Sequence, residues 1–225
     1  MTVAQKILAF YEALDVPKKL PKSVITMNPY QDKEAIPYTK LFYEKYYNDS
    51  QERTVLFGIN PGRFGGGVTG IPFTDPVKLE EDCEIPNPFD KRQELSSRFV
   101  YEVIDAFGGP NKFYADYYIS AISPLGFIQN GKNLNYYDIK DFKKLFEKYA
   151  HERILEQLDF PLNRKVAYSI GQGQNLKFLK ALNDKHKYFE RIETVPHPRW
   201  VMQYRLKRKQ EFIDEYLRTL TQAKN

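Results

Sequence analysis

Apolar residues recur along this chain with two different periods. Short runs rich in β-branched and aromatic residues predict four strands, of which Thr54–Ile59 and Phe113–Ile122 are expected to be buried and the others are Lys165–Ile170 and Ile192–Val195. Apolar residues spaced three or four apart predict helices, over Val3–Leu14, near Tyr38–Tyr47, from Ser96 or Ser97 to Phe107, across Phe142–Leu155, from about Asn175 through Leu182 and across Phe212–Leu220. Because strands alternate with helices, we expect a three-layer α/β/α fold with a central, mostly parallel four-stranded sheet.

The segments between these elements indicate one domain. Residues 17–53 mix prolines, tyrosines and charges, which predicts irregular structure around one short helix, and Asp75–Gln93 predicts a surface loop. The chain contains neither a linker nor a repeat or low-complexity tract. We therefore expect residues 1–225 to form a single domain, with residues 1–50 as a helical and irregular extension packed on it.

Composition narrows the classes of function. The 34 basic and 29 acidic residues give a net charge of +5, which permits a polyanionic partner without requiring one. Cys83 is the single cysteine, which excludes an internal disulfide and a cysteine-ligated iron–sulfur cluster, and three scattered histidines argue against structural zinc. We expect no metal and no cofactor. Without a long apolar run or a signal-peptide pattern, the sequence predicts an intracellular, cytoplasmic protein with no membrane partner, associated with the nucleoid if bacterial.

Candidate chemistry follows three of the predicted strands. Asn60 lies in the sequence GINPG, Gly171 in SIGQG and His197 in VPHPRW. In a parallel sheet these junctions share the carboxyl edge, where α/β proteins bind their ligands. An amide there can orient a water molecule, and a histidine can donate to a developing anion. Each motif alone also fits an ordinary turn or loop, but their conjunction favours a site.

Two glycine-containing loops suggest what that site binds. Residues 65–70 are dense in glycine and lead into Pro72-Phe73, which is typical of close backbone approach to a flat ligand. Gly171-Gln172-Gly173 precedes a predicted helix and can present free amide groups to a phosphate, although such a sequence is more often a plain helix cap.

The segment after His197 combines apolar and basic residues. Trp200, Val201 and Met202 could push into a base stack. Four cations, Arg205, Lys207, Arg208 and Lys209, fall in the expected first turn of the last helix, where the helix dipole is already positive. This placement favours an external anion such as nucleic-acid phosphate. The alternative is a solvated face that tolerates the cost.

These motifs resemble a known family. Residues 58–73, GINPGRFGGGVTGIPF, are similar to the GMNPGPFGMAxTGVPF motif of single-strand-selective monofunctional uracil-DNA glycosylases, with unbroken spacing from Asn60 to Phe73. SPLGFIQNGKNL, which ends at Leu134, resembles the family's CPLxFLxxSGRNL segment. GQGQNL at 171–176 resembles its GVGxxA loop, and HPR at 197–199 its terminal HPSP motif. The resemblance runs from about residue 50 to the end of the chain.

The resemblance implies a uracil-glycosylase-like fold and cleavage of the N-glycosidic bond of a damaged base in DNA. Asn60 would position the attacking water, and His197 would bond the base carbonyl as negative charge builds on the base. The residues implied in binding the base are Ile59, Gly62, Phe73 and Ala121. The residues implied in contacting DNA while the nucleotide is flipped out are Ser123, Gly171, Gln172, Gly173, Arg199, Trp200, Val201, Met202, Arg205, Lys207 and Arg208.

The chain departs from the family pattern at two places. The family reads uracil with an asparagine that corresponds here to Ala121, whose methyl group cannot pair with a base edge. Either backbone amides read the base, or specificity broadens towards xanthine or hypoxanthine. The second departure is HPRW in place of HPSP, which puts an aromatic residue in the segment after His197 that the resemblance implies wedges into the duplex.

The sequence therefore predicts a monomeric, monofunctional DNA glycosylase that removes deaminated bases, uracil foremost, in base excision repair. Its expected partner is single- or double-stranded DNA that contains a damaged base. One alternative is a catalytically weak protein that binds single-stranded or damaged DNA, which the loss of a base reader at Ala121 favours. A second is an enzyme acting on free nucleotides, which the basic and apolar segment at 199–209 disfavours.

Overall fold

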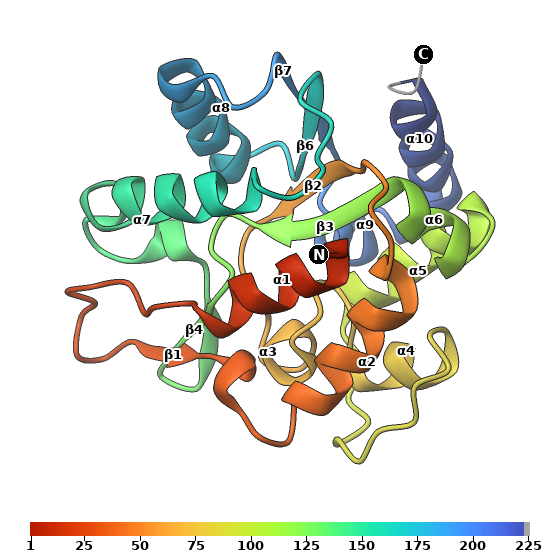
Figure 1. The fold of residues 1–225 in the computed structure, drawn as a ribbon, viewed down its shortest axis with the longest axis horizontal. Helices are drawn as coiled ribbons and strands as arrows, with labels where there is room; N and C mark the ends of the chain where they lie inside the picture. Colours follow the sequence, from red (N-terminus) through yellow and green to blue (C-terminus); the bar gives the residue numbers. More distant parts are fainter. Residues whose placement is uncertain (223–225) are drawn as a thin grey trace.

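A computed structural model describes residues 1–222. Its centre is a four-stranded parallel sheet in the order β3-β2-β6-β7, built from β2 (Thr54–Gly58), β3 (Tyr117–Ala121), β6 (Val166–Ile170) and β7 (Arg191–Val195). Every residue of β2, β3 and β6 is buried, as expected for strands covered on both faces. The four-stranded parallel sheet is confirmed, and helices lie around it in a three-layer α/β/α arrangement (Figure 1).

The helices pack into two groups. In Figure 1, α7 (Phe142–Gln157) and α8 (Gln174–His186) lie to the left of the sheet, and α7 contacts α1 (Val3–Glu12), which contacts α2 (Ile36–Tyr47). To the right, α5 (Leu95–Phe107) contacts α6 (Pro110–Asp116), α9 (Pro198–Tyr204) and α10 (Lys209–Gln222). Buried apolar residues from Val3 to Leu220 form one continuous core cluster, so the amino-terminal extension shares its core with the sheet.

The strands end flush on the side of the sheet that carries the candidate motifs. Gly58 pairs with Ala121, the last residues of β2 and β3, and Ile170 pairs with Val195, the last residues of β6 and β7. The next backbone bonds continue this order, since Ile122 N donates to Gly58 O and Ser123 N to Ile59 O. Asn60, Gly171 and His197 therefore fall on one edge, as the sequence predicted, and Ala121 lies at the same edge.

A second, antiparallel sheet was not predicted. It consists of β1 (Ile25–Met27), β4 (Gly126–Gln129) and β5 (Lys132–Leu134) in the order β1-β4-β5. Asn130-Gly131 connects β4 to β5 with positive φ at both residues, the conformation that a tight hairpin requires. This hairpin carries residues 132–136 to the end of β2, where they become part of the site.

Three sequence expectations need correction. The first four residues of the expected Phe113–Ile122 strand are helical, because Pro110 at the first helical position starts α6. The expected loop Asp75–Gln93 contains α4 (Pro76–Glu81), whose amino end is capped by Asp75. The last helix begins only at Lys209, after a turn of 3₁₀ helix, η3 (Leu206–Arg208).

The remaining elements are short. They are the helix α3 (Gly66–Thr69) inside the glycine loop and two 3₁₀ turns, η1 (Pro29–Gln31) and η2 (Tyr136–Asp138). Across residues 1–222 no helix combines the length and the apolar character needed to cross a membrane. The last three residues of the expected single domain, 223–225, lie outside the described residues.

Candidate active site

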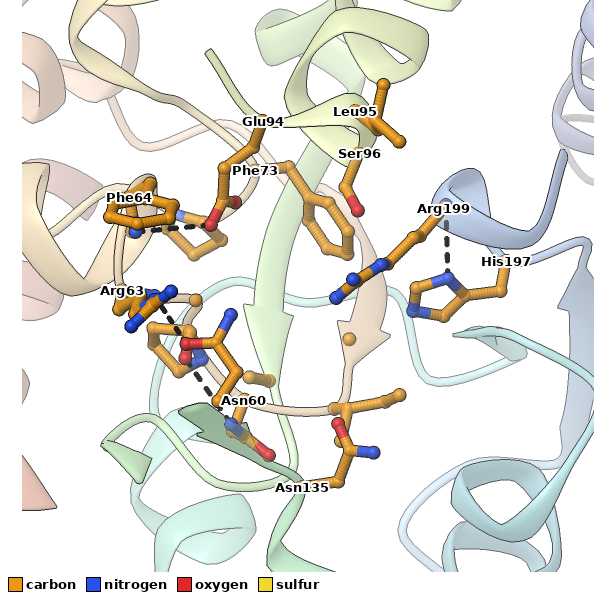
Figure 2. A pocket seen from close by; sticks show the side chains of 18 of the residues that line it. Asn60, Arg63, Phe64, Phe73, Glu94, Leu95, Ser96, Asn135, His197 and Arg199 are labelled. Carbon is orange, nitrogen blue, oxygen red and sulfur yellow. Dashed lines mark hydrogen bonds between the residues drawn. The ribbon is translucent and has the colours of Figure 1, made fainter. Parts of the chain in front are cut away.

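A cavity of about 530 Å³ opens at the carboxyl edge of the parallel sheet. That volume is typical of a small-molecule site. Its walls come from stretches far apart in the sequence, and they include six residues predicted from the sequence: Ile59, Asn60, Gly62, Phe73, Ala121 and His197. Arg199 also lines the cavity, and Figure 2 shows its side chain extending across it.

Backbone groups hold the side chain of Asn60 from two sides. Its Nδ2 donates to Leu134 O at 3.2 Å and to Pro61 O at 3.3 Å, and its Oδ1 accepts from Tyr136 N at 3.0 Å. These partners fix which end of the amide is oxygen. Both N–H groups are engaged, whereas one lone pair of Oδ1 is left for a further donor such as water.

The imidazole of His197 is held in one tautomer. His197 caps the amino end of α9, and its Nδ1 accepts the backbone N–H of Arg199 at 3.2 Å. Burial, assisted by the nearby Arg199 cation, lowers the pKa of His197 to about 4. The ring is therefore neutral at pH 7 with its proton on Nε2, the nitrogen that faces the cavity in Figure 2.

Gly171 supports the histidine and does not face solvent. A Cβ at this position would lie 3.3 Å from Cδ2 of His197, and the residue has a φ of +111°. The structure thus places buried Gly171 behind the ring, whereas its neighbours Gln172 and Gly173 are exposed before α8.

Phe73 forms the upper wall of the cavity in Figure 2. Its φ of +54° is rare for an aromatic residue. Ser97 Oγ donates to Phe73 O at 2.6 Å, and Asp75 N donates to the same hydroxyl at 2.8 Å. The ring lies so close to Gly58 that a Cβ there would come within 2.8 Å of Cε2. The missing side chain at Gly58 therefore leaves the space that the ring occupies.

Glu94 is a cavity residue that sequence reasoning missed. Its carboxylate accepts the N–H of Phe64 at 3.2 Å, and a Cβ on Gly62 or Gly65 would overlap it. Burial raises the pKa of Glu94. Gly62 thus makes room for this carboxylate. The sequence gives no local sign of the contact, because it joins a loop to the start of α5.

Besides Gly171, three of the residues predicted to contact DNA are buried in the structure. Val201 and Met202 pack into the hydrophobic core, so the apolar side chains that face outward here are Trp200, Tyr204 and Leu206. Ser123 is fully buried, and its hydroxyl donates to Leu125 O within the turn. As placed, Ser123, Val201 and Met202 cannot reach DNA, and we drop them as contacts.

The cations near the last helix do not crowd its first turn as expected. Arg208 pairs with Glu211, with Nη2 and Oε2 2.7 Å apart, and Lys209 pairs with Glu102 at 2.6 Å. The Arg205 guanidinium lies 4.8 Å above the Trp200 ring. Glu211 and Glu102 thus neutralise two of the four cations, Arg208 and Lys209, which reduces the unfavourable interaction with the helix dipole that had suggested an external anion. Arg205 and Lys207 are exposed before α10.

The fold and the cavity together define a three-layer α/β/α protein with a ligand site at the carboxyl edge of its parallel sheet. The chain belongs to the uracil DNA glycosylase superfamily, whose family profile matches residues 44–221. The crystal structure of wild-type Pedobacter heparinus SMUG2 is similar over 100% of this chain and 99% of that one, with a TM-score of 0.96 and 42% sequence identity. Comparison with curated proteins gives no match. These findings support a DNA glycosylase, a hydrolase of DNA repair, and they imply DNA as its substrate.

Proposed function

We propose that this protein is a monofunctional DNA glycosylase that removes deaminated bases, uracil foremost, from DNA in base excision repair. One observation carries the proposal: Asn60 and His197, 137 positions apart in the sequence, border one cavity together with Phe73 (Figure 2). The cavity lies at the carboxyl edge of a parallel sheet, as the family resemblance implies.

In the proposed reaction the damaged nucleotide is flipped into the cavity, and its base stacks on Phe73. The free lone pair of Asn60 Oδ1 orients a water towards the anomeric carbon of the sugar. An amide cannot act as a strong base, so the rate must come from stabilising an oxocarbenium-like sugar and a departing base anion. His197 Nε2–H donates to the base carbonyl, and a donor of this kind contributes about 2.7–4 kcal/mol. The bond between the anomeric carbon and the base nitrogen breaks, the water supplies the hydroxyl group that bonds to that carbon, and the second proton of the water goes to the departing base.

Water as nucleophile predicts a product with an intact strand. The protein should leave an abasic site that breaks only in alkali. Lys132 lies on the cavity wall but is exposed, and we assign it no covalent role. Borohydride should therefore trap no protein–DNA adduct.

The choice of bases follows from Ala121, which lines the cavity at the end of β3 and offers no hydrogen bond from its side chain. Xanthine and hypoxanthine are accordingly candidate substrates besides uracil. For DNA contacts we retain exposed residues: Arg199, Gln172, Gly173, Trp200, Arg205, Lys207 and Arg208. Gly171 keeps only a supporting role behind His197. We further propose that residues 1–225 act as one domain and as a monomer inside the cell.

A base-release panel tests the proposal. Oligonucleotides with one central uracil, xanthine or hypoxanthine are incubated with wild type, Asn60→Ala and His197→Ala and then heated in alkali. Wild type should cleave at uracil, and each variant should be slower by about 100- to 1,000-fold, the loss typical of one removed transition-state contact. Survival of all three wild-type substrates would overturn the proposal.

Ala121 also favours a second candidate, a catalytically weak protein that binds single-stranded or damaged DNA. It predicts salt-sensitive DNA binding that Asn60→Ala and His197→Ala leave unchanged, and no base release by any of the three proteins. The same panel, run with a binding assay on an oligonucleotide, separates the two candidates.

A further inference from the structure

The last side chain of β3 cannot hydrogen-bond to the Watson–Crick edge of a base in the cavity. Ala121 stands where the resembled family has an amide, and a methyl group neither donates nor accepts a hydrogen bond. Uracil, hypoxanthine and xanthine share one recognisable edge, an N–H next to a carbonyl. A side chain that reads this edge must present an acceptor and a donor side by side, as an amide does.

Asn60 cannot provide that pair. Both of its N–H groups are engaged by the carbonyls of Pro61 and Leu134. It retains an acceptor but no donor, which suits it to water and leaves the base edge unread.

Asn135 brings a second amide to the same cavity. It lies between β5 and η2, is partly buried and lines the cavity. An asparagine at the start of a helical turn ordinarily caps it, but the side chain of Asn135 makes no such bond. In Figure 2 its amide points up into the space between Asn60 and His197, on the side of the cavity opposite Phe73.

The backbone of Asn135 is fixed by Asn60 itself. The two groups that bind the Asn60 amide, Leu134 O and Tyr136 N, belong to the residues on either side of Asn135. The water-orienting amide and the second amide are thus locked together through bonds of 3.2 and 3.0 Å. This is the preorganisation that a base-reading group needs.

Asp138 fixes the orientation of the Asn135 amide. Asn135 Nδ2 donates to Asp138 Oδ2 at 2.8 Å, which identifies the nitrogen and discourages a flip. One N–H and the Oδ1 atom have no other bond in the described part of the chain, and together they match an N–H beside a carbonyl. Cytosine presents the reverse pattern at the same edge, an acceptor beside an amino group.

Building on the proposed glycosylase function, we propose that Asn135 reads the lactam edge of the flipped base, in place of the amide missing at Ala121. Oδ1 accepts N3–H of uracil, or N1–H of hypoxanthine or xanthine. Nδ2 donates to the adjacent carbonyl. The protein would thereby accept deaminated bases as a class and reject cytosine.

The test asks whether the effect of substituting Asn135 depends on one atom of the substrate, the N3 proton of uracil. Single-turnover excision from single-stranded oligonucleotides is measured for uracil and for 3-methyluracil, which lacks the N3 proton. In wild type, methylation should slow excision by about 10- to 100-fold, because a group built to be hydrogen-bonded is left unpaired and crowded. In Asn135→Ala this penalty should largely disappear, since the acceptor is gone and the methyl group has room. Asn135→Ser is measured in parallel, so the result does not rest on the folding of one variant.

Asn133→Ala is the matched control. Asn133 lines the same cavity two residues earlier, but its Oδ1 accepts the N–H of Arg63 at 3.0 Å. This variant should keep the wild-type methylation penalty, whatever its absolute rate. If wild type excises uracil but N3 methylation slows excision equally in wild type and in both Asn135 variants, Asn135 does not read the base, and the proposed glycosylase function still stands. Failure of wild type to excise uracil, xanthine or hypoxanthine would overturn the proposed function and the reader with it.

Discussion

Gly171 lies directly behind the ring of His197, and a Cβ at residue 171 would stand 3.3 Å from Cδ2 of the imidazole. The glycine also has a φ of +111°, which a side chain would strain. The GxG sequence that first suggested a phosphate cradle therefore has one residue turned inward to the histidine.

Gly171→Ala should slow base excision by up to about 100-fold, because a small displacement of a reacting group has that effect, while DNA affinity changes little. Gly173→Ala is the matched control, since an added Cβ there meets nothing within 4 Å. If Gly173→Ala lowers activity, it should do so by weakening DNA binding, and its rate of base excision at saturating DNA should equal that of wild type. Equal effects of the two substitutions on binding alone would contradict the supporting role of Gly171.

The depressed pKa of His197 predicts how pH acts on stability and rate. Its pKa falls from 6.5 to about 4 on folding, so between these values the unfolded chain binds more protons than the folded one. The free energy of unfolding should therefore decrease as pH falls through this window and stay level above it. Thermal melts of wild type and His197→Asn across this pH window should show that the melting temperature falls less in the variant as the pH is lowered.

A neutral His197 ring also predicts how the excision rate depends on pH. Single-turnover rates should show no transition near the usual histidine pKa of about 6.5, because the neutral ring is already the donor. A rate that rises on acidification through that range, and does so in wild type but not in His197→Asn, would show that an imidazolium takes part.

Trp200 and Val201 are neighbours on α9 with opposite environments. Trp200 is 40% exposed, whereas Val201 is completely buried. Trp200→Ala should reduce excision from duplex DNA more than from single strands, if the indole fills the space left by a flipped nucleotide. Val201→Ala should instead cost about 1–3 kcal/mol of folding free energy with little change in DNA affinity. Duplex binding that weakens with Val201→Ala and not with Trp200→Ala would reverse the assignment.

Lys207 and Arg208 allow a comparison between a cation with no ion pair in the described part of the chain and one that is paired within the protein. Both are exposed, but Arg208 forms an ion pair with Glu211. If Lys207 contacts phosphate, Lys207→Ala should lower the slope of log affinity against log salt concentration by about 1. Arg208→Ala should lower it less, because its charge is already partly neutralised within the protein. A larger change for Arg208 would mean that Glu211 releases it on binding DNA.

Much of the fold follows from local sequence. The strands β2 and β6 are short buried runs and β7 is a short, half-exposed one, and their ends carry Asn60, Gly171 and His197 to one edge. Residues 113–116 misled the prediction, because aromatic residues suit a buried helix as well as a strand. Pro110 after two glycines was the available signal for α6. Asp75-Pro76 likewise marks the start of α4.

The site was only partly predictable. Asn60, Phe73 and His197 stand out because each follows a strand or a glycine loop. Glu94 and Asn135 enter the cavity through contacts between distant segments, which no local pattern announces. The burial of Val201 depends on α9, and Pro198 at its first position was the sign that the segment is a helix and not an extended wedge.

The side chain of Asn60 takes the place of a missing strand, because it exchanges bonds with the backbone on both sides of Asn135 as a neighbouring peptide would. Together with Arg63 N, which donates to Asn133 Oδ1, Asn60 therefore links the loop after β2 to the small antiparallel sheet. Asn60 therefore has a structural role beside its proposed catalytic one, so a slow Asn60→Ala variant reports on catalysis only when it melts at the wild-type temperature. His197 fills no such gap between the sheets, and His197→Ala is the cleaner probe of the reaction.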